Sequence, residues 1–146
     1  MVSEMVRVVR EAGTVALYVW DYAGEMQLMR HFWDAAVALD PDARAKDEGV
    51  CFPICNPLSL RAVFEGANLR SVDVRSIDVS THFRDFDDYW TPFLGGHAPA
   101  PAYAMSLDET GRGALREHIR AHLPIAADGS IDLIARAWAV RAIVQR

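Results

Sequence analysis

Apolar residues follow two different spacings along the chain, and the spacing separates predicted strands from predicted helices. The run Thr14–Trp20 is apolar at nearly every position, which is typical of a central strand covered on both faces, often with parallel neighbours. Residues 26–39 carry apolar side chains at helical spacing, and Asp40-Pro41 ends this predicted helix. The charge-rich residues 41–50 predict a surface loop.

A second helix and a second strand follow in the middle of the chain. Asn56-Pro57 is a strong helix start, with Asn as the N-cap and Pro at the first helical position. Asn68 is expected to end this helix in the left-handed conformation. Residues 71–81 alternate as a strand, but their apolar phase slips, which predicts a β-bulge near residues 75–76.

The last third of the chain reads as a helical insertion followed by a strand. A short helix over 85–93 and a Gly/Pro-rich loop over 95–101 precede a capping box at Ser106, which opens a helix to about Leu123. Residues 131–144 form the last predicted strand. With a short helical stripe ending before Gly13, the order predicts one α/β domain over 1–146, with an insertion over about 83–129.

Composition narrows the class of protein. Hydrophobic residues make up 51% of the 146 residues and charged residues 24%, as in ordinary globular proteins. The net charge of −5 disfavours a nucleic-acid partner, since such partners select basic surfaces. No apolar run approaches the roughly 20 residues of a membrane span, and charges interrupt any signal core in the first twelve residues. We therefore expect no membrane partner and a cytoplasmic location.

Several segments resemble class I S-adenosylmethionine-dependent methyltransferases that act on small molecules (methyltransferase type 11-like). The segment EMVRVVREAGTVALYVWDYAGEMQLMRHFWDAAVALDP is similar to the helix, fifth strand and next helix of that family. FPICNPLSLRAVFEGANLRSVDVRSIDV resembles the following helix and the sixth strand, and ARAWAVRAIV resembles the seventh. The resemblance implies the C-terminal part of a Rossmann-like fold: a three-stranded mixed sheet with helices, its last strand antiparallel between the other two.

The same resemblance implies a cofactor that this chain is not equipped to hold alone. The family binds S-adenosylmethionine with a Gly-rich loop after the first strand and an acidic residue after the second, and neither segment exists here. Gly95-Gly96 and the pair Gly111 and Gly113 do not lie between a strand and a helix. No residue of this chain therefore inherits a cofactor-binding role.

Candidate substrate-binding residues follow the first strand, because ligands in open α/β sheets bind beyond the carboxyl ends of strands. Asp21, between Trp20 and Tyr22, would orient the substrate or take a proton; alternatively it caps the next helix and the two aromatic residues only pack. His31 would serve as a general base, or be a partly buried polar residue with one hydrogen bond. Trp33 lies beside it on the same predicted helix.

The insertion supplies the other candidates. FRDFDDYWTPFLGGHAPAPAYAMSL resembles the segment that helps to cover the acceptor pocket in the family, so residues 83–107 are expected to cover the carboxyl end of the first strand as a lid. Its aromatic face would be a lid wall or the insertion's own core. The substrate-binding set is Trp20, Asp21, Tyr22, His31, Trp33, Tyr89, Trp90 and Phe93.

Two residue pairs have spacings that suggest metal binding, but we expect both pairs to have only structural roles. Cys51 and Cys55 lack a second pair at zinc-site spacing, and an extended chain between them would hold them too far apart for a disulfide. His118 and His122 share a helical face without an acidic third ligand. We expect no metal.

Two functions remain open. In the first, the chain is the substrate-side half of a methyltransferase for a small-molecule acceptor, inactive until a separate N-terminal half supplies the cofactor site. In the second, it is a non-catalytic remnant that dimerises or binds a small ligand. Both predict a partner, either a second copy or the N-terminal half, at the unpaired edge of the Thr14–Trp20 strand.

Overall fold

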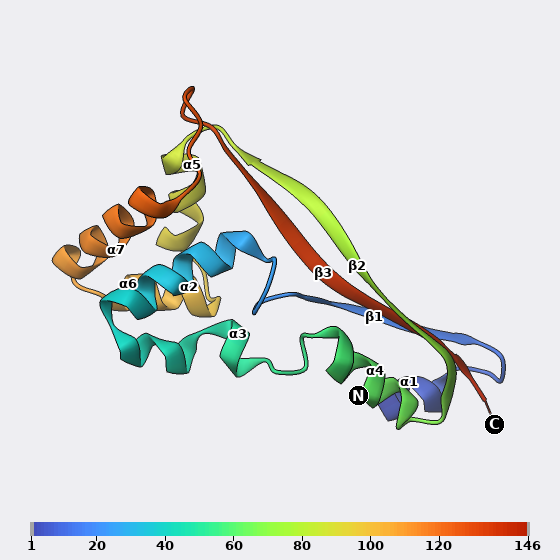
Figure 1. Cartoon of the computed structure of the whole chain (residues 1–146). Coiled ribbons are helices and arrows are strands. Elements are labelled where there is room, and N and C mark those ends of the chain that lie inside the picture. Colours follow the sequence, from blue (N-terminus) through green and yellow to red (C-terminus); the bar gives the residue numbers. More distant parts are fainter. Residues whose placement is uncertain (1, 146) are drawn as a thin grey trace.

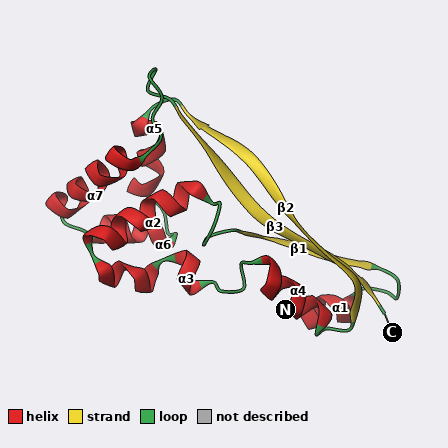
Figure 2. Cartoon of the chain, in the orientation of Figure 1, coloured by secondary structure: helices red, strands yellow, loops and turns green. Residues whose placement is uncertain are grey.

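Three strands form one antiparallel sheet, with helices packed against it near both ends (Figures 1 and 2). The computed structural model describes residues 2–145. The strands are β1 (Thr14–Trp20), β2 (Leu69–Phe83) and β3 (Ile131–Val144), and their order is β1-β3-β2. The last strand lies between the other two, as expected, and runs antiparallel to both.

Two expectations about this sheet are wrong. The sheet is antiparallel and not mixed, because β3 runs opposite to both strands it pairs with. Within the described residues β1 is an edge strand and not a central one, since β3 is its sole neighbour in the sheet. Its apolar side chains therefore alternate between a buried face, which holds Val15, and an open face, which holds Tyr18.

Helices cover opposite faces of the sheet at its two ends. Near the end of β3, Val140 and Val144 pack with Leu60 and Phe64 of α4 (Pro57–Glu65) and with Val2 of α1 (Val2–Val8). At the start of β3, Ile131 and Leu133 belong to a larger core formed with the remaining helices. Ile131 and Leu133 are odd-numbered, whereas Val140 and Val144 are even-numbered. Successive side chains of a strand point to opposite faces of the sheet, so the two cores lie on different faces.

This arrangement explains the phase slip in β2. Val74 packs with the α4 core, whereas Ile77 and Val79 lie on the other face and are exposed. The predicted bulge at residues 75–76 is wrong, because the pairing there is continuous and the register shifts between Arg70 and Asp73 instead. The other face of β2 is covered only at its far end, where Phe83 joins the larger core, so Val74 and Phe83 are packed on opposite faces while Ile77 and Val79 between them stay exposed.

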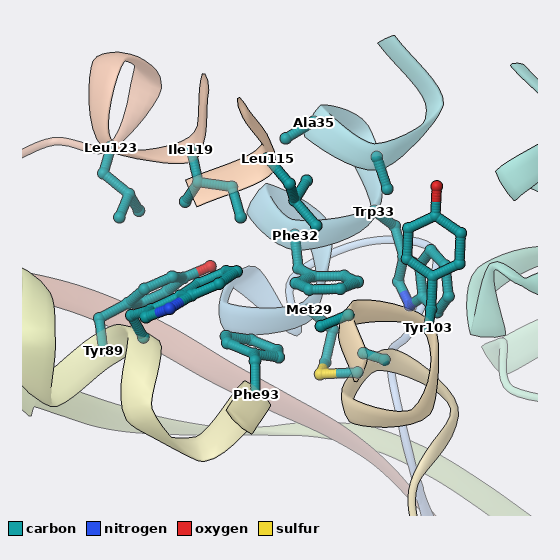
Figure 3. Close-up of a cluster of buried hydrophobic side chains, with 14 of the residues drawn as sticks. Met29, Phe32, Trp33, Ala35, Tyr89, Phe93, Tyr103, Leu115, Ile119 and Leu123 are labelled. Atoms are coloured by element: carbon teal, nitrogen blue, oxygen red, sulfur yellow. The ribbon is translucent and has the colours of Figure 1, made fainter. Parts of the chain in front are cut away.

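The larger core joins α2 (Gln27–Leu39) to the insertion (Figure 3). Phe32 of α2 is fully buried and stacks on Phe93 with 4.5 Å between ring centroids. The hydroxyl of Tyr89 donates to the carbonyl of Leu28 at 2.9 Å, which also ties the insertion to α2. The insertion consists of α5 (Phe86–Trp90), the 3₁₀ helix η2 (Thr91–Leu94), α6 (Pro99–Ser106) and α7 (Glu109–His122).

Side-chain caps decide several helix boundaries. Asn56 accepts from the Ser59 amide at 2.9 Å and begins α4 as predicted. The predicted capping box at Ser106 is wrong, because Asp108 caps α7 by accepting from the Gly111 amide. The helix α6 begins at Pro99 and takes up residues 99–101 of the predicted Gly/Pro loop.

The prediction of a surface loop over 41–50 is also wrong, because side-chain caps start two short helices in this segment. It forms η1 (Pro41–Lys46) and α3 (Glu48–Cys51), capped by the carboxylates of Asp40 and Asp47.

None of the helices in the described part of the chain has the length and apolar character that crossing a membrane requires.

Candidate functional site

An apolar hollow of about 390 Å³ lies between the η1–α3 segment and α6, and we call it the Glu48 hollow. It is the candidate site because a buried carboxylate lines it together with mostly apolar and aromatic walls, the usual composition of small-molecule sites. Its lining residues are Lys46, Glu48, Cys51, Phe52, Pro99, Ala102, Tyr103 and Ser106.

Local capping places Glu48 in this hollow. The carboxylate of Asp47 accepts from the Gly49 amide at 2.8 Å and starts the short helix α3 with Glu48 as its first residue. The Asp47 side chain is also held by Arg30 of α2 through two hydrogen bonds of 2.9 Å. The segment after η1 is thereby fixed to α2, and Glu48 is carried into the core.

Glu48 is 4% exposed and has one protein partner. The indole Nε1 of Trp33 donates to its Oε2 at 3.0 Å. Burial raises the pKa of Glu48 above the ordinary carboxyl range, although the Trp33 hydrogen bond and the Arg30 charge act in the opposite direction. Within residues 2–145 no cation forms an ion pair with this carboxylate.

Arg30, whose charge acts on Glu48, is engaged elsewhere. Its guanidinium donates to Asp47, to Asp34 at 2.8 Å and to the carbonyl of Tyr22 at 3.0 Å. Burial would lower the pKa of Arg30, but the hydrogen bonds with Asp47 and Asp34 outweigh it and raise that pKa. The guanidinium therefore stays charged and neutralises Asp47, which leaves Glu48 without a counter-ion of its own.

Aromatic rings connect the hollow to the end of β1. Phe52 lines the hollow, and its ring centroid lies 5.7 Å from that of Tyr22, two residues beyond β1. Across the hollow, Tyr103 lies 5.6 Å from Trp33 and carries the Lys46 ammonium 5.3 Å from its ring centroid (Figure 3 shows Trp33 and Tyr103 side by side). Burial, followed by the Glu48 charge, raises the pKa of Tyr22.

Asp21 closes the turn after β1. Its carboxylate accepts from the Glu25 amide at 2.9 Å, and its carbonyl accepts from Gly24 and Met26. A Cβ at Gly24 would overlap this carboxylate, so a glycine is needed there for close approach. Asp21 is buried in these contacts and holds the turn before α2. It does not cap that helix, because the N-cap of α2 is Met26, which has no side-chain capping bond.

His31 lies in a second, polar hollow of about 580 Å³, together with Arg30, Asp34 and Arg44. Burial lowers the pKa of His31, and the nearby Asp34 charge opposes that shift. No hydrogen bond joins its imidazole to any side chain of the described segment 2–145. Burial therefore favours the neutral form of the ring, which lines this hollow.

The aromatic candidates from the two elements meet in the protein core. Trp33, Tyr89, Trp90 and Phe93 are all buried in the larger core of Figure 3. Of these four, Trp33 alone reaches the Glu48 hollow, through its bond to Glu48. Trp20 lies on the open face of β1 and is half-exposed.

The sequence prediction missed Glu48, Phe52 and Tyr103. Phe52 and Tyr103 are isolated aromatics outside every predicted helix and strand, and Glu48 is one of several charges in residues 41–50. The one available signal was Asp47 followed by a glycine two positions later, a capping arrangement that makes Glu48 the start of a helix.

The Cys and His pairs with spacings that suggest metal binding are not joined by further ligands within the described residues. Among residues 2–145 no three His, Cys, Asp or Glu side chains are grouped to hold a metal ion. Cys51 is exposed and donates to the Ala45 carbonyl, and Cys55 is buried as a free thiol. His118 and His122 stack at 4.4 Å on the face of α7.

Comparison with protein families and with curated proteins identifies no relative of this chain. The functional argument therefore depends on the sheet, its open edge and the Glu48 hollow.

Proposed function

We propose that this chain is the substrate-side part of an S-adenosylmethionine-dependent methyltransferase for a small molecule, with the cofactor held by polypeptide outside these 146 residues. The observation that carries the proposal is the strand order β1-β3-β2, with the last strand antiparallel between the others. This is the order that the sequence resemblance implies for the fifth, seventh and sixth strands of that family.

The insertion gives a second line of support. It lies between β2 and β3, where the family carries the segment that helps to cover its acceptor pocket. Its helix α6 forms one wall of the Glu48 hollow through Tyr103, and Phe52 links that hollow to Tyr22 beyond β1. A hollow near the carboxyl end of a strand is where open α/β sheets place ligands.

The described residues do not fit S-adenosylmethionine by themselves. Gly95 and Gly96 lie between η2 and α6, and Gly111 and Gly113 lie inside α7, so none of these forms a turn from a strand into a helix. The residues present serve the acceptor side, where Glu48 supplies a polar contact and Trp33 orients it.

The open edge of β1 supports the need for a partner. The Asp21 amide donates to Arg136 and the Val144 amide to Gly13, so odd-numbered residues of β1 pair with β3. The backbone groups of its even-numbered residues therefore point away from β3. No Lys, Pro or bulge interrupts β1, and such an edge recruits another strand.

The partner at this edge is a separate N-terminal half or a second copy. Beside the edge, the open sheet face carries Tyr18, 70% exposed, and a shallow apolar hollow of about 420 Å³. In a two-fold antiparallel pair centred on Leu17, Tyr18 lies opposite Ala16 and Trp20 opposite Thr14. Each large side chain then faces a small one, which favours self-association.

Cofactor titration tests the main proposal. Calorimetry with S-adenosylmethionine should give no micromolar binding to the isolated chain. The DNA upstream of Met1, read in frame, should encode a strand followed by a Gly-rich loop. Co-expression of that segment should restore cofactor binding and transfer of a radioactive methyl group. Micromolar binding by the isolated chain, or no binding by the co-expressed pair, would contradict the proposal.

The alternative is a non-catalytic module that dimerises or binds a small ligand. The same edge and hollow favour it, because both are complete within the described residues, whereas a cofactor loop is absent from them. An upstream stop codon together with a stable dimer would favour this function over the first.

A further inference from the structure

We infer that the Glu48 hollow binds a small apolar molecule that carries a cationic amine, with the ammonium group on the Glu48 carboxylate. The inference depends on the hollow and not on methyl transfer. Identifying the bound amine as the methyl acceptor would additionally rest on the proposed function.

The first argument is the unmatched charge. A buried carboxylate is ordinarily paired, because removing it from water is costly. Glu48 is 4% exposed and receives one neutral hydrogen bond, from Trp33. Arg30 neutralises Asp47 instead. Among residues 2–145 no protein group bonds to Oε1 of Glu48, and the hollow that Glu48 lines provides an approach for a cation.

The second argument is the character of the walls. Phe52 and Tyr103 present aromatic rings to the hollow, and rings of this kind attract cations as well as apolar surface. Lys46 already shows this attraction, since its ammonium lies 5.3 Å from the Tyr103 ring centroid. An ammonium group on a ligand would meet the same ring and, in addition, a carboxylate.

Size and charge select the class of ligand. A volume of about 390 Å³ lies at the small end of ligand sites. Glu48 is an acceptor, so a molecule that brought a carboxylate or phosphate to this side chain would be repelled. A single-ring amine satisfies both conditions.

The test compares three probes of the same shape with different charge. 2-Phenylethylamine, 2-phenylethanol and 3-phenylpropionate would be titrated into the full chain at pH 7, with ¹H–¹⁵N spectra recorded. The Trp33 indole signal, assigned with a Trp33→Phe variant, reports on the bond to Glu48. The amine should shift this signal saturably and bind at least about tenfold more tightly than the alcohol, because its hydrogen bond is charge-assisted. The propionate should not bind.

Glu48→Gln is the matched variant. Glutamine keeps an acceptor for Trp33 but removes the charge, so the amine should bind it no better than the alcohol does. Lys46→Gln removes a cation that occupies the Tyr103 ring in the hollow, so the amine should bind this variant more tightly than the natural chain.

Equal affinity of the amine and alcohol for the natural chain would overturn the inference, and so would undiminished amine binding to Glu48→Gln. The comparison of the three probes uses the natural chain, so it can overturn the inference even if a variant fails to fold. Failure here leaves the cofactor experiment untouched, so the two proposals fail separately.

Discussion

Replacing Phe32 by alanine should remove much of the stability of the larger core. Phe32 is 0% exposed, stacks on Phe93 at 4.5 Å and meets Trp33 edge-on at 5.2 Å. Truncating a buried phenylalanine costs about 3–5 kcal/mol, against a total of about 5–15 kcal/mol for a domain. Because Phe32 joins α2 to the insertion, the loss would affect the packing of both.

Urea unfolding followed by far-UV circular dichroism measures this loss. With a slope of about 2 kcal/mol per molar urea, a loss of about 4 kcal/mol lowers the midpoint by about 2 M. Leu58→Ala is the control, because Leu58 is exposed on α4 and its removal should change the free energy of unfolding by less than about 0.5 kcal/mol. If Phe32→Ala unfolds within about 1 kcal/mol of the natural chain with the same slope, the aromatic cluster is not the core described above.

Three further outcomes are expected. Burial holds the pKa of Glu48 above its unfolded value, so the folded state keeps that proton longer and stability falls as the pH rises from the ordinary carboxyl pKa through the raised one. Glu48→Gln should abolish this part of the pH dependence in urea titrations, and equal slopes against pH in both proteins would refute the assignment. Asn56→Ala removes the cap on Ser59 and should cost about 1 kcal/mol, whereas Asn56→Asp, which keeps an acceptor, should cost much less by the same assay. Light scattering at micromolar concentration should give twice 16.2 kDa for the isolated chain; a clean monomer would mean that the β1 edge does not recruit a second copy.

The sequence alone located the three strands and the helices α2 and α4, because their signals are local. It did not reveal η1, α3 or α6. An apolar β-branched run placed β1 at Thr14–Trp20, and the alternation over 131–144 placed β3. Asn56 began α4, and Asn68 took the left-handed conformation with φ 56°, as its short polar side chain allows.

The tertiary structure decided which apolar surfaces are core and which charges are buried. The aromatic face of the insertion was visible in the sequence, but only packing against Phe32 made it part of the core. Glu48 looked like one charge in a surface segment. It became the polar centre of a hollow because Asp47 capped its helix, Arg30 fixed that helix to α2, and Trp33 supplied a hydrogen bond from a distant position. Such a site depends on contacts between separate parts of the chain, and no local pattern encodes them.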